Sequence, residues 1–253
     1  MHHNTNGIVR IAHRAGGVGI YENKIETIKR ALRCDFIDAI EVDVRKTKDD
    51  VLVLSHARGV KTNGKRVWID RTSFKDIQHL GIVTLDEILP LFKDTDKILD
   101  LDIKDRGTAL ALKEAIKKNT YFKKIYISSF DLRLLFEIQE VLPHGSYFLS
   151  SNIKDSRDFS QQRVFKAFLI FAFIFLSRFA VFFLKRKYKK IKLDGISLFY
   201  RFASRGFIDY LKHFGLKVLV WGTDKEKDIK KMTHFNIDGI KLKNITLFKK
   251  LRS

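Results

Sequence analysis

Short apolar runs rich in β-branched residues recur eight times along the 253 residues of this chain, and each is bounded by polar or glycine-containing stretches. They cover residues 8–12, 37–44, 98–103, 125–128, 147–149, 195–198, 218–221 and 239–242. Most stretches between them have helical spacing, as at Ile25, Ile28 and Leu32. Strands that alternate with helices indicate βαβ units and a parallel sheet. Eight such units in about 250 residues predict a closed (β/α)8 TIM barrel of the α/β class, with an open doubly wound sheet as the alternative.

The interval after the second run is too long for a simple connection. Residues 45–83 include a further apolar run at 51–54, which follows the turn-forming pair Asp49 and Asp50. We expect a strand extension and a small insertion over one end of the barrel. Thr84 then precedes Leu-Asp-Glu-Ile, which predicts a helix with a threonine cap. Because the chain shows no internal repeat and no flexible linker, residues 1–253 are expected to form one domain.

Composition limits the cellular setting. Cys34 is the single cysteine, which excludes a disulfide within the chain, and residues 1–20 lack the pattern of a secretory signal, so a reducing cytosol is expected. The 49 lysine and arginine residues against 29 acidic ones give a net charge of +20. This charge favours polyanions such as nucleic acid or an anionic bilayer, or else reflects only a solvated basic surface. No nucleic-acid motif is recognisable, so no nucleic-acid partner is expected.

One segment departs from the pattern of an outer barrel helix. Within residues 164–192, the stretch 167–184 is rich in phenylalanine and apolar nearly all round, and six basic residues follow it at 185–192. Its length is borderline for a bilayer span, but a single span would divide the barrel across the membrane. We therefore expect a helix or helical hairpin in the interface of an anionic membrane, with the protein peripheral on the inner, cytoplasmic face. A buried helix or an oligomer contact is the alternative.

Two acidic residues share one face of the second run. Glu41 and Asp43 are two positions apart, so their side chains project to the same side of the strand. Two carboxylates so placed repel one another, and a hard divalent cation with oxygen ligands would relieve the repulsion. The pair therefore predicts a metal site.

Other chemically active residues stand at the ends of further runs. His13 and Arg14 follow the first run, and Trp221 ends the seventh run. Asp100 and Asp102 lie within the third run, and Lys104 follows it. Catalytic groups of parallel barrels gather at the carboxyl ends of the strands, and ionisable residues are rare within parallel strands. Taken singly, Asp102 and Lys104 could form a simple ion pair, and Trp221 could belong to the core. Their convergence on one rim predicts an active site.

These residues occur in motifs that resemble those of the glycerophosphodiester phosphodiesterases, whose barrel is related to that of phosphatidylinositol-specific phospholipase C. The matches are Ile-Ala-His-Arg at 11–14, Glu-Asn at 22–23, Ile-Glu-Val-Asp-Val at 40–44, Thr-Lys-Asp at 47–49, His56, Thr-Leu-Asp-Glu-Ile at 84–88, Asp-Ile-Lys at 102–104, Val-Trp at 220–221 and Asp-Gly-Ile at 238–240. They are collinear over nearly the whole chain. Departures include Ala15 for a usual glycine, Asp102 for a more usual glutamate, and Lys241 and Lys243 in the last run.

The resemblance implies roles for these residues. His13 and His56 would be the paired acid and base, and Arg14, Lys104 and Trp221 would face the substrate. Glu41, Asp43 and Asp102 would hold one divalent cation, Ca²⁺ or Mg²⁺.

The resemblance also implies a reaction. It is the metal-dependent hydrolysis of glycerophosphodiesters, or of lysophospholipids, to glycerol 3-phosphate or lysophosphatidic acid and an alcohol. The attacking group would be water or a hydroxyl of the substrate itself. A catalytically inactive, membrane-bound barrel that binds lipid is the alternative.

Overall fold

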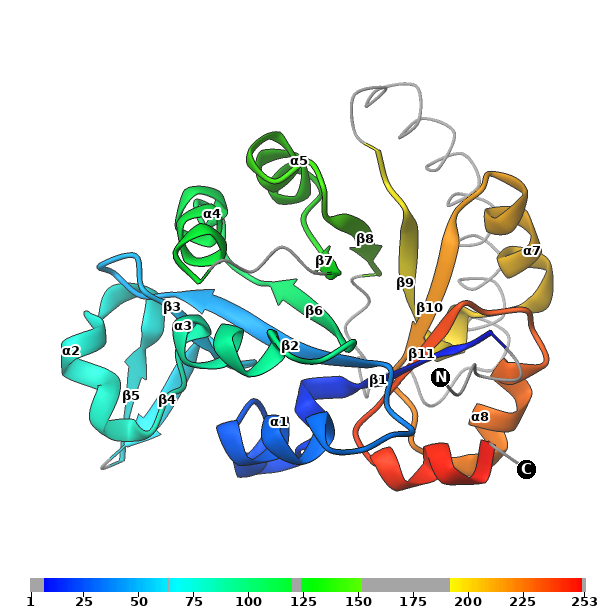
Figure 1. Ribbon diagram of the computed structural model, residues 1–253, viewed down its shortest axis with the longest axis horizontal. Helices are drawn as coiled ribbons and strands as arrows, with labels where there is room; N and C mark the ends of the chain where they lie inside the picture. The colour runs from blue at the N-terminus through cyan, green and yellow to red at the C-terminus, as the bar shows by residue number, and fades with distance from the viewer. Residues whose placement is uncertain (1–6, 63, 120–123, 152–191, 252–253) are drawn as a thin grey trace.

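The structure, a computed structural model, describes residues 7–62, 64–119, 124–151 and 192–251, and its central feature is a closed parallel barrel (Figure 1). The barrel strands are β1 (Val9–Ala12), β2 (Ala39–Lys46), β6 (Ile98–Ile103), β7 (Ile125–Ser129), β8 (Ser146–Ser150), β9 (Gly195–Phe199), β10 (Lys217–Trp221) and β11 (Gly239–Leu242). Each pairs in parallel with its neighbours, and β1 pairs with both β2 and β11, which closes the ring. The predicted barrel is confirmed, and the open-sheet alternative is wrong.

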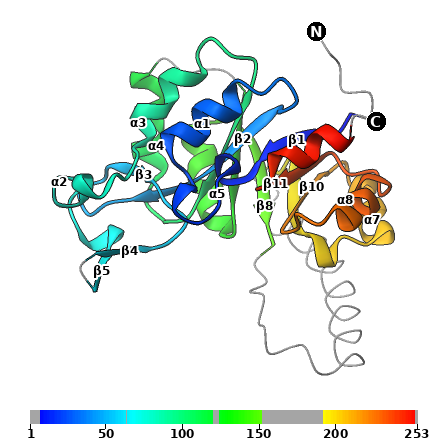
Figure 2. The same ribbon diagram turned by 90° about the horizontal axis from the view of Figure 1, so that it is seen from below.

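Helices follow most of the strands and lie around the barrel (Figures 1 and 2). They are α1 (Ile25–Leu32), α3 (Leu85–Ile88), α4 (Ala109–Lys118), α5 (Leu132–Val141), α7 (Arg205–His213) and α8 (Glu226–Thr233). The predicted cap of α3 is confirmed as a capping box: Thr84 Oγ1 accepts from the Glu87 N–H (3.2 Å), and Glu87 Oε2 accepts from the Thr84 N–H (2.7 Å). Between sheet and helices lies the main apolar core.

The structure also describes short 3₁₀ segments. They are η1 (His13–Gly16), η2 (Gly19–Tyr21), η3 (Ile69–Arg71), η4 (Gln78–Leu80), η5 (Leu89–Phe92), η7 (Tyr200–Phe202) and η8 (Ile245–Leu251). The first two lie between β1 and α1, so the chain turns tightly where the barrel opens at the end of its first strand.

A separate apolar cluster fills the inside of the barrel. Ile11, Ala39, Phe148 and Leu219 come from four different strands, and such side chains can meet only in the interior. Glycine on neighbouring strands makes the room, since a Cβ on Gly195 would lie 2.7 Å from the Phe148 ring. Residues two positions further along each strand point to the same face. The cluster therefore forms a floor, and the next inward-facing layer belongs to the carboxyl-end mouth.

The long connection after β2 forms an insertion beside the barrel. The predicted run at 51–54 is a strand, β3 (Leu52–Leu54), which pairs antiparallel with β2. A hairpin of β4 (Gly59–Thr62) and β5 (Lys65–Trp68) and the short α2 (Phe74–Ile77) follow. Figure 1 shows these elements grouped at one side of the molecule, next to α3. A small cluster of Val53, Ile69 and Ile77 packs between them.

The Phe-rich stretch at 167–184 lies outside the described residues, as does nearly all of the basic run that follows it. Among the helices that the structure does describe, none combines the length and the apolarity that a bilayer crossing requires.

Helix α4 offers a matched test of the packing. Leu112 is fully buried in the main core, whereas Leu110 is 69% exposed. We expect Leu112→Ala to lower the free energy of unfolding by about 2–5 kcal/mol, because it leaves a cavity, and Leu110→Ala to change it by less than about 0.5 kcal/mol. Urea denaturation followed by circular dichroism measures both. Equal effects would contradict the assigned face of α4.

Candidate active site

The chain makes a tight left-handed turn directly after β1. Arg14 and Ala15 have φ angles of 52° and 59°, a region that residues with a Cβ rarely adopt. Two hydrogen bonds hold the turn: the Arg14 N–H donates to Glu41 Oε2 (2.6 Å), and the Arg14 carbonyl accepts from the Gly17 N–H (3.1 Å). These bonds offset the strain, and they fix His13 and Arg14 against the acidic strand β2.

Three carboxylates from two neighbouring strands meet at the mouth. Glu41 and Asp43 belong to β2, and Asp102 is paired with Asp43 across the β2–β6 ladder. One oxygen from each lies within 4.8 Å of the others, and all three residues are buried. Asp102 Oδ1 is buried without a hydrogen-bond partner. The carboxylates that the sequence analysis assigned to a metal thus form one compact group.

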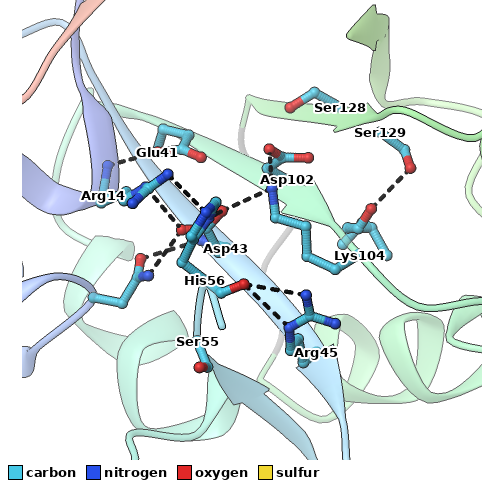
Figure 3. A network of polar contacts seen from close by, with 12 residues as sticks. Arg14, Glu41, Asp43, Arg45, Ser55, His56, Asp102, Lys104, Ser128 and Ser129 are labelled. Carbon is cyan, nitrogen blue, oxygen red and sulfur yellow. Dashed lines mark hydrogen bonds and ion pairs between the residues drawn. The ribbon is translucent and has the colours of Figure 1, made fainter. Parts of the chain in front are cut away.

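Cations balance part of this negative charge. Lys104 Nζ lies 2.8 Å from Asp43 Oδ1 and also pairs with Asp102 Oδ2. Arg14 Nε lies 3.5 Å from Asp43 Oδ2. Asp43 is therefore the carboxylate on which most of the positive charge converges (Figure 3).

The pKa values of the three carboxyl groups diverge. Burial opposes the charged form of Asp43, but Lys104 and the hydrogen bond from His56 outweigh it, so the pKa of Asp43 lies well below its usual range. Burial, and then the charge of Asp43, raise the pKa of Glu41 well above its usual range. Burial also raises the pKa of Asp102, although Lys104 opposes the shift. The charged forms of Glu41 and Asp102 thus remain disfavoured in this group, chiefly because both side chains are buried.

His56 connects this group to the opening. Its Nδ1 lies 3.0 Å from Asp43 Oδ1, and its Nε2 lies 3.0 Å from Arg14 Nη2 (Figure 3). Because a guanidinium can only donate, this network assigns the proton to Nδ1 and leaves the lone pair of Nε2 as acceptor. The side chain is 47% exposed, so it stands where substrate would enter.

His13 is the deeper of the two histidines. Its side chain is 13% exposed, its Nε2 lies 3.9 Å from Glu41 Oε2, and its ring meets Trp221 edge-on with centroids 6.4 Å apart. Burial, reinforced by the charge of Arg14, lowers the pKa of His13 well below its usual range. His13 is therefore neutral at pH 7.

One cavity at the mouth of the barrel unites the predicted residues. It is lined by His13, Arg14, Glu41, Asp43, His56, Asp102, Lys104, Phe130, Ser150, Ser197, Trp221 and Lys241. The first seven of these and Trp221 are the eight residues to which the resemblance gave roles, whereas Asp100, which the sequence analysis also placed at this rim, is not part of the lining. His13, Glu41, Ser150 and Trp221 each follow a floor residue by two positions, which explains why they face inward.

Asn23 was matched as part of a motif, but its role was missed. Its Nδ2 donates to Asp43 Oδ2 (2.9 Å), and its Oδ1 accepts from the Asp43 N–H (3.1 Å). Asn23 thus holds the central carboxylate in a two-point clamp. No spacing rule signals this contact, because Asn23 lies in a loop with φ of 57°.

Lys241 was noted only as a departure in the last run. It is 4% exposed on β11, and its Nζ lies 2.6 Å from Asp100 Oδ2 on β6. The same rule that selected the β2 acids could have found it, since a lysine within a parallel strand is as unusual as a carboxylate.

The donor set fits a hard divalent cation. Ca²⁺ and Mg²⁺ take oxygen ligands, and three carboxylates within ligand distance of one another supply them. The unpartnered Asp102 Oδ1 is a buried acceptor that an ion would satisfy.

Comparison with protein families gives a match over most of the chain. The sequence model of the Glycerophosphoryl diester phosphodiesterase family matches residues 13–246. A glycerophosphodiester phosphodiesterase of Caldanaerobacter subterraneus subsp. tengcongensis is 26% identical in an alignment of 252 positions. The alignment covers 91% of this chain and 91% of the relative.

Solved structures of similar fold include two phosphodiesterases. A glycerophosphodiester phosphodiesterase from Thermotoga maritima superposes with a TM-score of 0.70 at 25% identity and covers 99% of this chain and 100% of its own. An Oleispira antarctica phosphodiesterase in complex with its product sn-glycerol-3-phosphate has a TM-score of 0.76 at 18% identity, with 97% of each chain covered.

Proposed function

Because this chain belongs to the glycerophosphoryl diester phosphodiesterase family, and so is a phosphoric diester hydrolase, we propose that it hydrolyses glycerophosphodiesters with the help of one divalent cation. The products are glycerol 3-phosphate and an alcohol. The observation that carries the proposal is the approach of three buried carboxylates, two of which have a histidine beside them. The glycerol 3-phosphate bound as product by the Oleispira relative agrees with this substrate class.

Glu41, Asp43 and Asp102 are the residues that would hold the cation, Ca²⁺ or Mg²⁺. When bound, the ion supplies positive charge that stabilises the oxygens of the phosphodiester as cleavage places negative charge on them. Asn23 keeps Asp43 in place for this task through its two hydrogen bonds.

Arg14 and Lys104 bind the phosphodiester. Both line the cavity, and both are held by carboxylates, so their guanidinium and ammonium groups are fixed before substrate arrives. Fixed donors aimed at the non-bridging oxygens stabilise the transition state without reorganisation. A bound phosphate would also draw Arg14 Nη2 away from His56 Nε2, because a charged oxygen is the better acceptor.

The two histidines divide the proton transfers. His13 is held neutral by burial, so it is suited to accept the proton of the attacking hydroxyl or water. His56 keeps its Nδ1 proton toward Asp43; once bound phosphate has drawn Arg14 away, its Nε2 takes up a proton from solvent and donates that proton to the leaving alkoxide. Trp221 and Phe130, whose rings meet at 6.3 Å between centroids, form the apolar wall against which the glycerol carbons pack.

Product analysis tests the proposed function. The purified protein is expected to release choline and glycerol 3-phosphate from glycerophosphocholine, and a chelator should reduce the rate by at least about 10²-fold, with recovery on addition of Ca²⁺ or Mg²⁺. Phosphorus NMR follows the diester and the monoester together. Activity that is unchanged by chelator would contradict the role of the metal. Absence of turnover with any glycerophosphodiester would contradict the proposed substrate class.

The same site would accept lysophospholipids, which share the head-group linkage and yield lysophosphatidic acid. Residues 1–253 then form one barrel domain that carries the insertion at 45–83 and a membrane-associating segment at 164–192. The apolar stretch at 167–184, followed by basic residues, supports a peripheral position on the inner face of an anionic membrane.

Vesicle flotation tests this membrane association. The protein is expected to float with vesicles containing roughly 30 mol% of an anionic phospholipid, and to bind less at about 0.5 M salt. Replacing Lys185, Arg186, Lys187 and Lys189 by serine should reduce binding by about tenfold or more. Equal flotation with neutral and anionic vesicles would contradict an electrostatic contribution from the basic run.

A further inference from the structure

A second charged pair lies beside the acidic group, since Asp100 of β6 is the register partner of Glu41 in the β2–β6 ladder. Lys241 of β11 and Asp100 of β6 form an ion pair at 2.6 Å, with side chains 4% and 0% exposed. Ser128 Oγ donates to Asp100 Oδ1 (3.1 Å), so the aspartate is held from a third strand. The proposed mechanism uses none of these residues.

Stability alone does not account for this pair. Removing two charges from water costs several kcal/mol for each ion, and a buried ion pair often stabilises a protein no more than an apolar pair of the same size. The neighbouring floor cluster is apolar and includes Phe148 and Ile11, the register partner of Lys241, so this part of the barrel is filled without any charge. The charge of Lys241 therefore calls for another role.

The neighbours of Lys241 indicate that role. Its ammonium group lines the same cavity as Glu41 and Asp102, and its charge acts on both carboxylates. Lys104 supplies a second ammonium group to Asp43 and Asp102 from above. Of the four acidic residues that share this region, Asp100 is the one that neutralises Lys241 by direct contact.

We propose that Lys241 and Asp100 set the affinity of the carboxylate group for a divalent cation, Lys241 by weakening it and Asp100 by limiting that effect. This inference rests on the proposed metal site. A fixed positive charge repels a dication about twice as strongly as it repels a single charge at the same place. Lys241 thus makes the ion exchangeable, and Asp100 keeps the repulsion from preventing binding altogether.

Titration calorimetry with CaCl₂ and with MgCl₂ tests whether the charges of Lys241 and Asp100 set the cation affinity. The full-length protein, freed of metal with EDTA, is compared with Lys241→Met, Asp100→Asn and the double variant, each similar in size to the original pair. Lys241→Met is expected to bind the cation at least about tenfold more tightly, and Asp100→Asn at least about tenfold more weakly. The double variant should fall within about threefold of the wild type, because its net charge is unchanged.

Opposite changes in cation affinity in the two single variants, which cancel in the double variant, distinguish this role from a structural one. If the pair only supported the fold, both single variants would bind more weakly, and that result overturns the inference. Should Lys241→Met fail to fold by circular dichroism, the double variant must still bind at least about threefold more tightly than Asp100→Asn.

Glu41→Gln distinguishes failure of this inference from failure of the metal site. Binding by the wild type that Glu41→Gln abolishes, together with unchanged affinity in Lys241→Met, overturns the role of Lys241 alone. Absence of any cation binding by the wild type overturns the metal site and this inference with it.

Discussion

Replacing His13 or His56 by alanine is expected to lower kcat/KM for glycerophosphocholine by about 10³-fold, the usual size of a lost general acid or base. The two losses should not add in full, because the histidines act in one reaction. His144 is exposed and lies outside the cavity lining, so His144→Ala is the matched control and should retain full activity. Circular dichroism establishes that each variant is folded.

A substrate with a different leaving group distinguishes the roles of the two histidines. A glycerophosphodiester of p-nitrophenol needs no proton on departure, so His56→Ala should recover most of its lost rate on this substrate. His13→Ala should remain impaired, because the attacking hydroxyl or water still needs a base. Recovery by His13→Ala instead would reverse the assignment, and equal loss on both substrates in both variants would contradict a division of roles.

Asp43→Asn is expected to reduce kcat/KM by about 10³-fold or more and to abolish detectable Ca²⁺ and Mg²⁺ binding. The substituted amide would keep the size of the side chain but lose the charge that pairs with Lys104 and orients His56. It would also present an N–H₂ group toward donors, so one of the contacts from Asn23 or Lys104 must break.

Calorimetry and the product assay measure the two consequences of Asp43→Asn separately. Asp96 is exposed and stands outside the cavity lining, so Asp96→Asn is the control for a lost negative charge. If Asp43→Asn bound the cations normally but lost activity, the role of Asp43 would be limited to orienting His56. Normal activity would contradict its central position in the site.

Much of the fold was predictable because its signals are local. Each barrel strand is a short apolar run, and α3 begins with a threonine and a glutamate at the spacing of a capping box. The period of two along a strand then placed Glu41 and Asp43 on one face without any knowledge of the fold. Closure of the barrel was predicted only from the number of strand–helix units. The pairing of β1 with both β2 and β11 establishes it.

The parts that escaped prediction depend on contacts between distant segments. The clamp of Asn23 on Asp43 spans 20 residues and arises from a left-handed loop conformation that asparagine tolerates. The pair of Lys241 with Asp100 joins β11 to β6 across the barrel, and neither residue reveals its partner in the sequence. The left-handed turn at Arg14 and Ala15 was also not predicted, because neither residue type by itself indicates such a conformation.

The most direct measurement of the central claim is a crystal structure of the protein with Mn²⁺ and glycerol 3-phosphate, with the metal located by anomalous scattering. The expected result is one ion with oxygens of Glu41, Asp43 and Asp102 at about 2.1–2.6 Å, and the phosphate between the rings of His13 and His56. An ion bound elsewhere, or a phosphate beyond the reach of both imidazoles, would contradict the account.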